Sequence, residues 1–478
     1  MTRADNTITI YSGQHQGHLD QNQLQNVRHI PGYAVVKQYR EVAFKKGTFQ
    51  LAYDDVAAHI DPTTVSFSTP NNPNVAAVLE QNFQFDLVST EQLLNRYLEQ
   101  TITVIHGPDS QHQTTGVLLS TAGGMTLQLD NDQVISIQQW QHIEFPELPG
   151  GLLTKPTLVW LLESLSSRTE TIAMSYQTRG MTWWADYNVI LHEGPDQSCT
   201  LDLSSWVSIV NKSGASFHDT RLKLIAGDVN RAPTNQPVRQ VAREALVQAA
   251  GTADFSEQAL FEYHLYKLPR TIDLPNNSTK QIQLLNHTNG VHCERTLVFN
   301  GSGQHHINYH RPITDSGYLR RTDAKVAAWL SFKNAANNHL GMPLPAGRVR
   351  VNMLDPDDGS VEFIGEDRID HTPKNDTIEL KLGHAFDVQG SRQQLHFERG
   401  KNSLTEQLAV TINNQKDRPQ KVTIIEPLYR WSNWQITQHN EQYEKIDAST
   451  IQFTIEVPAD SEKTVEYTVL YQWPDQQP

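Results

Sequence analysis

A pattern of strand, asparagine, turn and strand recurs three times in the second half of this chain. In each copy an alternating apolar and polar run ends on an asparagine, a polar turn with glycine or proline follows, and a second alternating run returns. The asparagines are Asn211, Asn334 and Asn413. The pattern is typical of antiparallel strand pairs with one buried face. Its irregular spacing indicates stacked β-sandwich modules rather than a periodic solenoid.

Composition and charge exclude several classes of protein. The 478 residues are enough for about three domains of an ordinary soluble protein. The net charge is −14, and no cluster of Lys or Arg exceeds a pair. Nucleic acid is therefore not expected as a partner, because it needs a concentrated basic stripe. No apolar run reaches the roughly 18 residues of a membrane-spanning helix, so no transmembrane segment is expected.

The N-terminal sequence bears on the cellular location. The first residues, MTRADNTITIYSG, lack the charged and apolar regions of a signal peptide. We therefore expect a cytoplasmic protein. A periplasmic or cell-surface location is the alternative if a leader has been removed.

The first third of the chain is expected to hold two small modules. An N-terminal β module over residues 1–100 ends in a short helix, which a capping box at Ser89 and Gln92 begins. Within it, the polar stretch 13–29 is expected to be a loop insertion. Residues 101–150 resemble a small β-barrel, because four short strands are separated by Gly-Gly and Asn-Asp turns.

The rest of the chain is expected to form three further β modules. A first β-sandwich covers residues 151–300, and an amphipathic helix is inserted at 237–250. A β module follows over 301–378, and an immunoglobulin-like β-sandwich over 379–478. The expected fold class is therefore mostly β.

The usual catalytic spacings are absent from the sequence. It has no Gly-rich phosphate loop, no dinucleotide fingerprint, no HExxH zinc helix, no nucleophile elbow and no CxxC pair. We therefore assign no catalytic residue, no cofactor and no metal. Glycosidase and protease sites are often scattered along a chain, so this absence is only modestly informative.

Two clusters bear some likeness to metal sites. On a strand, His306 and His310 would stand about 13 Å apart and His305 would face the other way, so surface histidines are the favoured interpretation. Residues 355–359 with Glu366 resemble a calcium loop. Their glycine falls at the fifth position instead of the sixth, which favours an acidic β-turn.

Three tryptophans are candidate ligand or module-contact residues. Strand parity over residues 181–191 places Trp183 on the core face and Trp184 on the opposite face. Trp184 is then an exposed stacking platform for a sugar or peptide, or it is buried against a neighbouring module. The module contact is favoured. The same alternatives apply to Trp431 and Trp434.

The only cysteines, Cys199 and Cys293, are too few for a disulfide scaffold or a four-thiolate zinc site. Each precedes an alternating run, so the two can be neighbours at strand ends of one module and form a disulfide in an exported protein. Two buried, reduced cysteines are the alternative. Since no leader is seen, the reduced pair is favoured.

A resemblance to a known family covers nearly the whole chain. The matching stretches are residues 175–193, SYQTRGMTWWADYNVILHE; residues 201–231, LDLSSWVSIVNKSGASFHDTRLKLIAGDVNR; FEYHLYKLPR; STKQIQLL; LKLGHAFDV; and, upstream, AYDDVAAHIDPTTVSF and FPELPGGLLTKPTLVWLL. Taken in their order along the chain, these stretches resemble the bacterial domain of unknown function 4139 of mucoidy-inhibitor-A-like proteins. The long coiled-coil-like helix pair of that branch is absent, and the polar stretch near the N-terminus is unusual. The resemblance implies no activity, ligand or catalytic residue.

These observations together favour a bacterial, multi-module β protein. We expect a non-catalytic binding, scaffolding or envelope-associated interaction protein with an unknown protein or carbohydrate partner. The alternative is a hydrolase acting on carbohydrate or peptide through scattered carboxylates. Two carboxylates about 5 to 10 Å apart in an open cleft, one with a raised pKa, would favour the hydrolase. The sequence does not indicate the oligomeric state.

Overall fold

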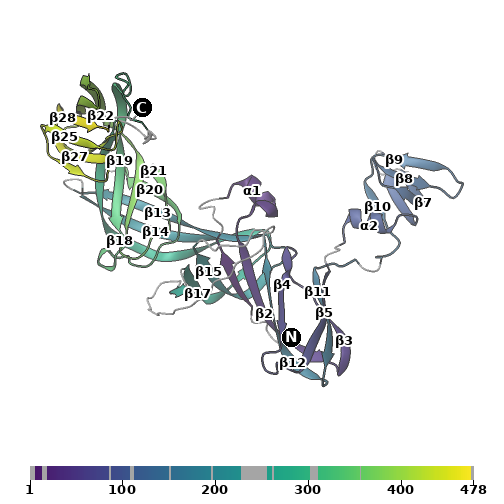
Figure 1. Cartoon of the computed structure of the whole chain (residues 1–478). Coiled ribbons are helices and arrows are strands. Elements are labelled where there is room, and N and C mark those ends of the chain that lie inside the picture. The colour runs from purple at the N-terminus through teal and green to yellow at the C-terminus, as the bar shows by residue number, and fades with distance from the viewer. Residues whose placement is uncertain are drawn as a thin grey trace.

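The computed structural model describes residues 6–12, 19–84, 88–107, 112–149, 152–194, 198–227, 256–260, 263–301, 311–355 and 357–474. Strands account for 65% of the structure and helices for 4%, so the expectation of a mostly β fold is confirmed. The molecule is elongated, with its sheets arranged one after another (Figure 1). The helix expected at 237–250 and the three histidines His305, His306 and His310 lie outside the described residues.

Two sheets near the N-terminus combine distant parts of the chain. The larger has the order β16 (Ser256–Leu260), β17 (Tyr263–Leu274), β15 (Phe217–Ala226), β1 (Thr7–Tyr11), β2 (Tyr33–Phe44), β12 (Arg168–Thr178), β4 (Ile60–Ser68). The smaller has the order β3 (Gly47–Tyr53), β11 (Thr157–Ser164), β5 (Ala76–Gln84). The expected modules 1–100 and 151–300 therefore share sheets, because strands from both pair with one another.

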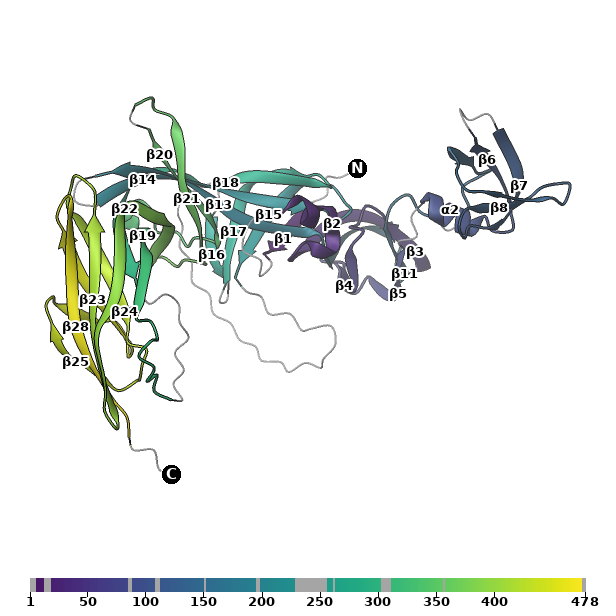
Figure 2. The same cartoon turned by 90° about the horizontal axis from the view of Figure 1, so that it is seen from above.

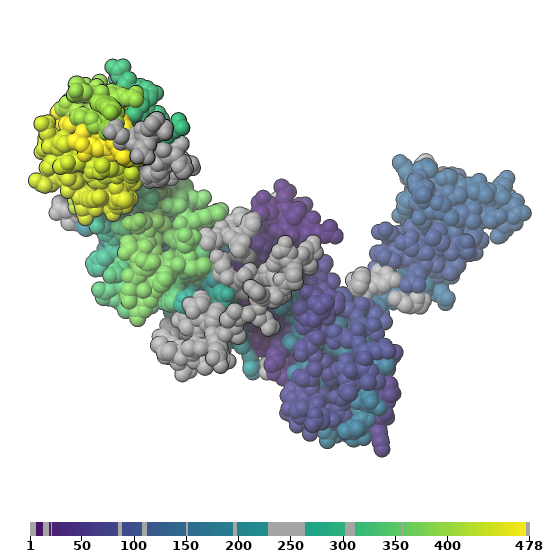
Figure 3. All heavy atoms as spheres, viewed as in Figure 1, coloured from purple at the N-terminus to yellow at the C-terminus, as the bar shows by residue number. Residues whose placement is uncertain are grey.

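A separate unit stands at one end of the molecule (Figure 3). Helix α2 (Thr90–Arg96) precedes a five-stranded sheet of order β10 (His142–Glu144), β6 (Thr101–His106), β7 (His112–Ser120), β8 (Met125–Gln128), β9 (Val134–Ile137). The Ser89 side chain accepts a hydrogen bond from the Gln92 N–H at 3.1 Å, so the expected N-cap is confirmed. Among the described residues no strand pairing joins β9 to β10, and the small β-barrel expected over 101–150 stays a prediction.

One sheet of thirteen strands runs through the second half of the molecule. Its order is β21 (Val361–Ile369), β20 (Gly347–Leu354), β13 (Met181–Glu193), β14 (Ser198–Asn211), β18 (Ser278–Asn300), β19 (Arg321–Lys333), β22 (Thr377–Arg399), β23 (Ser403–Asn414), β28 (Ser461–Gln472), β25 (Trp434–His439). The other three strands lie off this path: β24 (Gln420–Pro427), β26 (Tyr443–Lys445) and β27 (Thr450–Val457). The hairpin of β20 and β21 projects from the rest (Figure 2).

Three buried asparagines explain the recurring sequence pattern. The Asn211 side-chain amide donates to the carbonyls of Ala215, Leu274 and Pro275 at 2.9 to 3.2 Å. Its Oδ1 accepts the N–H of Ser213 at 3.1 Å. This side chain therefore ties the end of its own strand to a Leu-Pro pair at the end of a later strand.

The other two copies repeat this arrangement. Asn334 donates to Met342, Thr372 and Pro373, and Asn414 donates to Arg418, Val457 and Pro458, at 2.9 to 3.5 Å. The third asparagine is thus Asn414, and the prediction of Asn413 was wrong by one residue. We call Asn211, Asn334 and Asn414 the asparagine staples.

Each staple belongs to a four-stranded unit. The stapled strand pairs antiparallel with the strand that follows the proline, as β14 with β18, β19 with β22, and β23 with β28. Two of the strands that lie between them in sequence also pair antiparallel, as β15 with β17, β20 with β21, and β24 with β27. The chain therefore contains three copies of one unit, joined edge to edge through β18–β19 and β22–β23.

Two strands of 23 residues each connect the two large cores. In β18, Ile282 and Leu284 belong to the first core, whereas Leu297 and Phe299 belong to the second. In β22, the first core takes Ile378 and Leu380, and the second takes Val388. The expected module boundary between residues 378 and 379 thus falls inside a strand.

Candidate functional site

A cleft of about 760 Å³ lies where strands from several parts of the thirteen-stranded sheet meet the turn after Asn414. Its walls include the end of β13, parts of β18, β19 and β22, one residue each of β20, β21 and β27, Lys416, and residues 418–421. A concave site of this size suits a small molecule or a short peptide end. Because these segments are far apart in sequence, the cleft depends on the long-range strand pairing.

The apolar wall comes from five different strands. It includes Leu191, Leu297, Trp329, Met353 and Leu382. The β19–β22 register shifts here: Ala328 pairs with Gly383 and Trp329 with Lys381, so Leu382 is an extra residue in its strand. A bulge of this kind bends a strand and changes the direction of its side chains.

The charged wall is mainly basic. It carries four cations (Arg295, Lys416, Arg418 and Lys421) and two carboxylates (Glu193 and Glu456), in a chain of net charge −14. Glu193 lies between two of the cations: it forms an ion pair with Arg295, and its Oε2 lies 3.4 Å from Arg418 Nη2. The surplus of two positive charges favours an anionic group in the cleft.

Arg295 occupies an electrostatically costly position. Burial lowers the pKa of its guanidinium, Glu193 partly reverses this, and Arg418 lowers the pKa further. Its Nε atom is buried and has no hydrogen-bond partner among the described residues. A buried donor without an acceptor costs about 1 to 3 kcal/mol, which adds to the electrostatic cost of this position.

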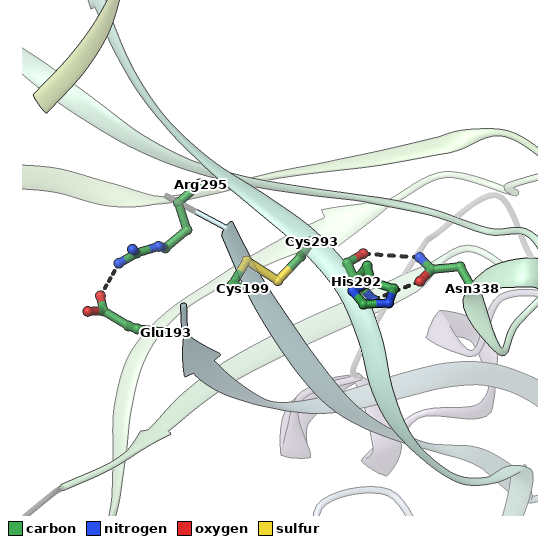
Figure 4. Close-up of a disulfide and its surroundings, with 6 residues drawn as sticks. All are labelled: Glu193, Cys199, His292, Cys293, Arg295 and Asn338. Carbon is green, nitrogen blue, oxygen red and sulfur yellow. Dashed lines mark hydrogen bonds and ion pairs between the residues drawn. A yellow bond between two sulfur atoms is a disulfide. The ribbon is translucent and has the colours of Figure 1, made fainter. Parts of the chain in front are cut away.

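A disulfide lies near Glu193 and Arg295 (Figure 4), two of the residues that line the cleft. Cys199 and Cys293 are register partners on β14 and β18, with Cα atoms 4.9 Å apart, and their sulfurs are bonded. The structure therefore has the disulfide rather than the favoured pair of reduced cysteines. Cys199 lies at the start of β14, as expected, whereas Cys293 lies within β18 rather than at a strand entry. Cys199 also pairs with Glu193 of the cleft, so the bridge fixes the strands that carry Glu193 and Arg295.

The second staple unit supports the same region. The Asn338 side chain accepts from the His292 N–H at 2.7 Å and donates to the His292 carbonyl at 3.0 Å. Figure 4 shows this pair beside the disulfide. The residue before Cys293 is thus anchored to the turn that follows Asn334.

The three candidate tryptophans do not form a ligand platform in the cleft. Trp184 is only 6% exposed, contacts a cluster that includes Leu19 and Ile30, and donates to Asp186 at 2.8 Å. Trp431 and Trp434 pack, partly buried, against the second core. The tryptophan that lines the cleft is Trp329, which sequence reasoning did not single out.

The segment that covers Trp184 corrects another expectation. Residues 19–30 contain helix α1 (Gln21–Gln25) and the short helix η1 (Val27–His29), and Asp20 forms a capping box with Gln23. The second half of the stretch expected to be a loop is therefore structured. The signal was present in the sequence, since Asp followed three residues later by Gln is a capping box.

No group of three or more His, Cys, Asp or Glu in the described part of the chain has metal-binding geometry. Asp355, Asp357 and Asp358 lie between β20 and β21, where Asp355 and Asp358 accept backbone N–H groups at 2.8 Å. Their carboxylates are used to build the turn. An acidic turn was the interpretation that the sequence favoured.

Carboxylates in this protein are held charged at several turns. Asp273, Asp358 and Asp447 each have a pKa below the ordinary value, chiefly because a backbone N–H donates to the carboxylate. A general acid needs the opposite, a raised pKa. In the cleft, Glu193 forms an ion pair with Arg295, and its Oε2 lies 3.4 Å from Arg418 Nη2.

Comparison of the chain with protein-family models, with curated proteins and with solved structures finds no match. Among the residues that the structure describes, no helix is both long enough and apolar enough to cross a lipid bilayer.

Proposed function

We propose that this protein is a non-catalytic binding protein and that the cleft beside the disulfide holds its ligand. The observation that supports this most is the combination, in one concave site, of an apolar wall and a surplus of cations. Sites that bind organic ligands share this design, in which apolar walls supply affinity and a few polar groups fix orientation.

The hydrolase alternative has less support. Hydrolysis of a glycosidic bond uses two carboxylates, one of which is kept protonated by its surroundings. Here Glu193 forms an ion pair with Arg295 and lies beside Arg418, so the two guanidinium groups occupy its carboxylate. A ligand bound in this cleft should therefore be released unchanged.

For the partner, only the chemical class is proposed. A protein or a carbohydrate remains the expected partner, and a bacterial, envelope-associated role in the family of the domain of unknown function 4139 remains the proposed context. Trp329 is the cleft aromatic on which a sugar ring or an apolar side chain would stack.

A matched pair of neighbouring residues tests the cleft. Met353 lines it, whereas Leu354 is the next residue of β20, does not line it and is 40% exposed. Full-length wild-type protein, Met353→Trp and Leu354→Trp should be purified from the native host under mild conditions, and the retained molecules identified by mass spectrometry.

The proposal expects a molecule that wild type and Leu354→Trp retain unchanged and that Met353→Trp loses. Equal retention by all three proteins would overturn the assignment to the cleft. Conversion of the retained molecule during incubation would overturn the non-catalytic role.

A further inference from the structure

We infer that the cleft binds a carboxylate attached to an apolar body, either a free organic acid or the apolar C-terminal residue of a protein. This inference rests on the proposed binding function and specifies the chemistry of the ligand. Three features of the cleft support the inference: the two arginines around Glu193, the fixed turn after Asn414 and the apolar wall.

The anion-binding side of the cleft is built from Arg295 and Arg418. Arg418 Nη2 is 3.4 Å from Glu193 Oε2, a long contact that leaves its other donors for a ligand. The Arg295 Nε atom is buried without a partner in the described part of the chain. A carboxylate accepts several hydrogen bonds at once and matches the planar guanidinium group.

The turn that carries Lys416 and Arg418 is held in place before any ligand binds. The Asn414 side chain accepts the Lys416 N–H at 3.1 Å and donates to the Arg418 carbonyl at 3.0 Å. The Gln420 side chain donates to the Pro419 carbonyl at 2.7 Å. A fixed backbone reduces the entropy that the site loses on binding, which favours affinity.

The apolar wall indicates that the rest of the ligand is apolar. Leu297, Trp329 and Leu382 come from three adjacent strands, β18, β19 and β22, and Met353 lies on the projecting hairpin. Burying a methylene group contributes roughly 0.8 kcal/mol, so an acid with an apolar chain should bind more tightly than acetate. An inorganic anion would leave this wall exposed to water.

Competition against a fluorescent probe tests the charge requirement. The probe is 1-anilinonaphthalene-8-sulfonate, which is itself an apolar anion, and the competitors are octanoate, octan-1-ol and octyltrimethylammonium. We expect octanoate to bind at least ten-fold more tightly than octan-1-ol and the cation to bind most weakly. The two sources of the carboxylate are a free organic acid and a protein C-terminus. To distinguish them, the binding of acetyl-Leu-Leu with a free carboxylate is compared with that of the same peptide as its amide.

Substitutions locate the binding to the arginines. Arg418→Gln should reduce octanoate affinity to that of octan-1-ol, whereas Arg399→Gln, an exposed residue outside the cleft, should leave it unchanged. Lys416→Gln provides a second test if Arg418→Gln unfolds, and circular dichroism establishes folding. Met353→Trp should abolish displaceable probe binding, and Leu354→Trp should not.

The outcomes separate the two proposals. If octanoate and octan-1-ol compete equally in wild type and Met353→Trp blocks both, the cleft is a binding site but the carboxylate inference fails. If the probe binds wild type and Met353→Trp alike, the proposed cleft itself fails. Octanoate selectivity that survives both Arg418→Gln and Lys416→Gln would also overturn the inference.

Discussion

The turn after Asn211 and the turn after Asn414 are held by the same hydrogen bonds but face different surroundings. In the first, Ser213 is fully buried, and its carbonyl accepts the N–H groups of Ala58 and His59 at 2.8 and 3.2 Å. In the second, Lys416 and Arg418 line the cleft. The staple fixes the turn from inside, so the outer residues can serve either packing or binding.

Glycine shows how tightly the first turn is packed. Gly214 has a φ of +88°, and a Cβ added to it would lie 2.4 Å from the Ala58 Cβ. Only a residue without a side chain fits there. The turn after Asn414 carries long charged side chains instead, because the cleft lies in front of it.

The two regions are also reinforced differently. Near the first staple unit, a covalent bond joins Cys199 and Cys293. The unit of Asn414 instead takes part in two buried ion pairs, Arg392 of the neighbouring β22 with Glu426 and Arg430 with Glu406, both at 2.8 Å and with side chains at most 1% exposed. Burial disfavours the charge of Arg392, but Glu426 outweighs this and raises the pKa of the guanidinium.

The largest expected effect comes from breaking an ion pair in the third unit. Arg430 also donates to the carbonyls of Ile313 and Asp315, at 3.1 and 2.8 Å. Arg430→Met should lower the free energy of unfolding by about 5 kcal/mol, because Glu406 is left buried and unpaired. Urea denaturation measures the loss, with exposed Arg399→Met as the control.

The double variant Arg430→Met with Glu406→Met sharpens this test. Replacing both charges by apolar groups should recover most of the stability. If the free energy of unfolding of Arg430→Met lies within about 1 kcal/mol of the wild-type value, the ion pair does not support the third unit.

The second prediction concerns the covalent reinforcement of the first region. The bridge closes a loop of 94 residues, and its loss should cost about 4 kcal/mol through the entropy of the unfolded chain. Reductant should therefore lower the unfolding free energy of wild type to that of the double variant Cys199→Ala with Cys293→Ala, and should leave that variant unchanged.

Thiol blocking in the native host tests whether the bridge forms there. Protein alkylated at lysis and then denatured without reductant should carry no alkylated cysteine. Two alkylated cysteines per chain would show a reduced pair, which a reducing compartment would produce.

The third prediction asks whether the staples are equivalent. Asn211→Ala and Asn414→Ala should each cost about 3 kcal/mol, since several buried carbonyls lose their donor. Asn413→Ala, next to the third staple but only half-buried, should cost less than about 0.5 kcal/mol. A larger loss for Asn413→Ala than for Asn414→Ala would contradict the assignment of the staple.

The smallest expected effect is a dependence on pH in the first region. Burial acts to raise the pKa of Asp202, but hydrogen bonds from His192 and from the Gly290 N–H outweigh it and lower the pKa. The folded pKa lies below the unfolded value of about 4. The stabilisation is therefore complete above that pH and is lost as the pH falls through the folded pKa.

Asp202→Asn should accordingly reduce the slope of unfolding free energy against pH in the acid range and leave the slope above neutral pH unchanged. Urea denaturation at a series of pH values measures both slopes. An unchanged acid slope would mean that Asp202 does not contribute to it.

Much of the fold could be predicted from alternation alone. Parity over residues 181–191 placed Trp183 in the core and Trp184 on the other face, and the place of Trp183 in the first core and of Trp184 in a separate cluster confirms it. Strand parity also points to Asn414 as the third staple, since it shares the buried face with Leu408, Val410 and Ile412. The error at Asn413 came from stopping one residue early.

The cleft could not be predicted because no local pattern marks it. Its residues meet through parallel pairing of β13 with β20 and of β18 with β24, and through the bulge at Leu382. Alternation fixes which face of a strand is buried but not which distant strand lies beside it. The register pairing of Cys199 with Cys293 likewise depends on long-range contacts, and the reduced pair was favoured because no leader was seen.

The 23-residue strands β18 and β22 have a mechanical consequence. Each is roughly 75 Å long if fully extended, and each is anchored in both large cores. Tension applied along the molecule between those cores would be carried by the strands themselves and would load their inter-strand hydrogen bonds in shear. Hydrogen bonds loaded in shear share the force and break together. This part of the molecule should therefore resist stretching as a single unit.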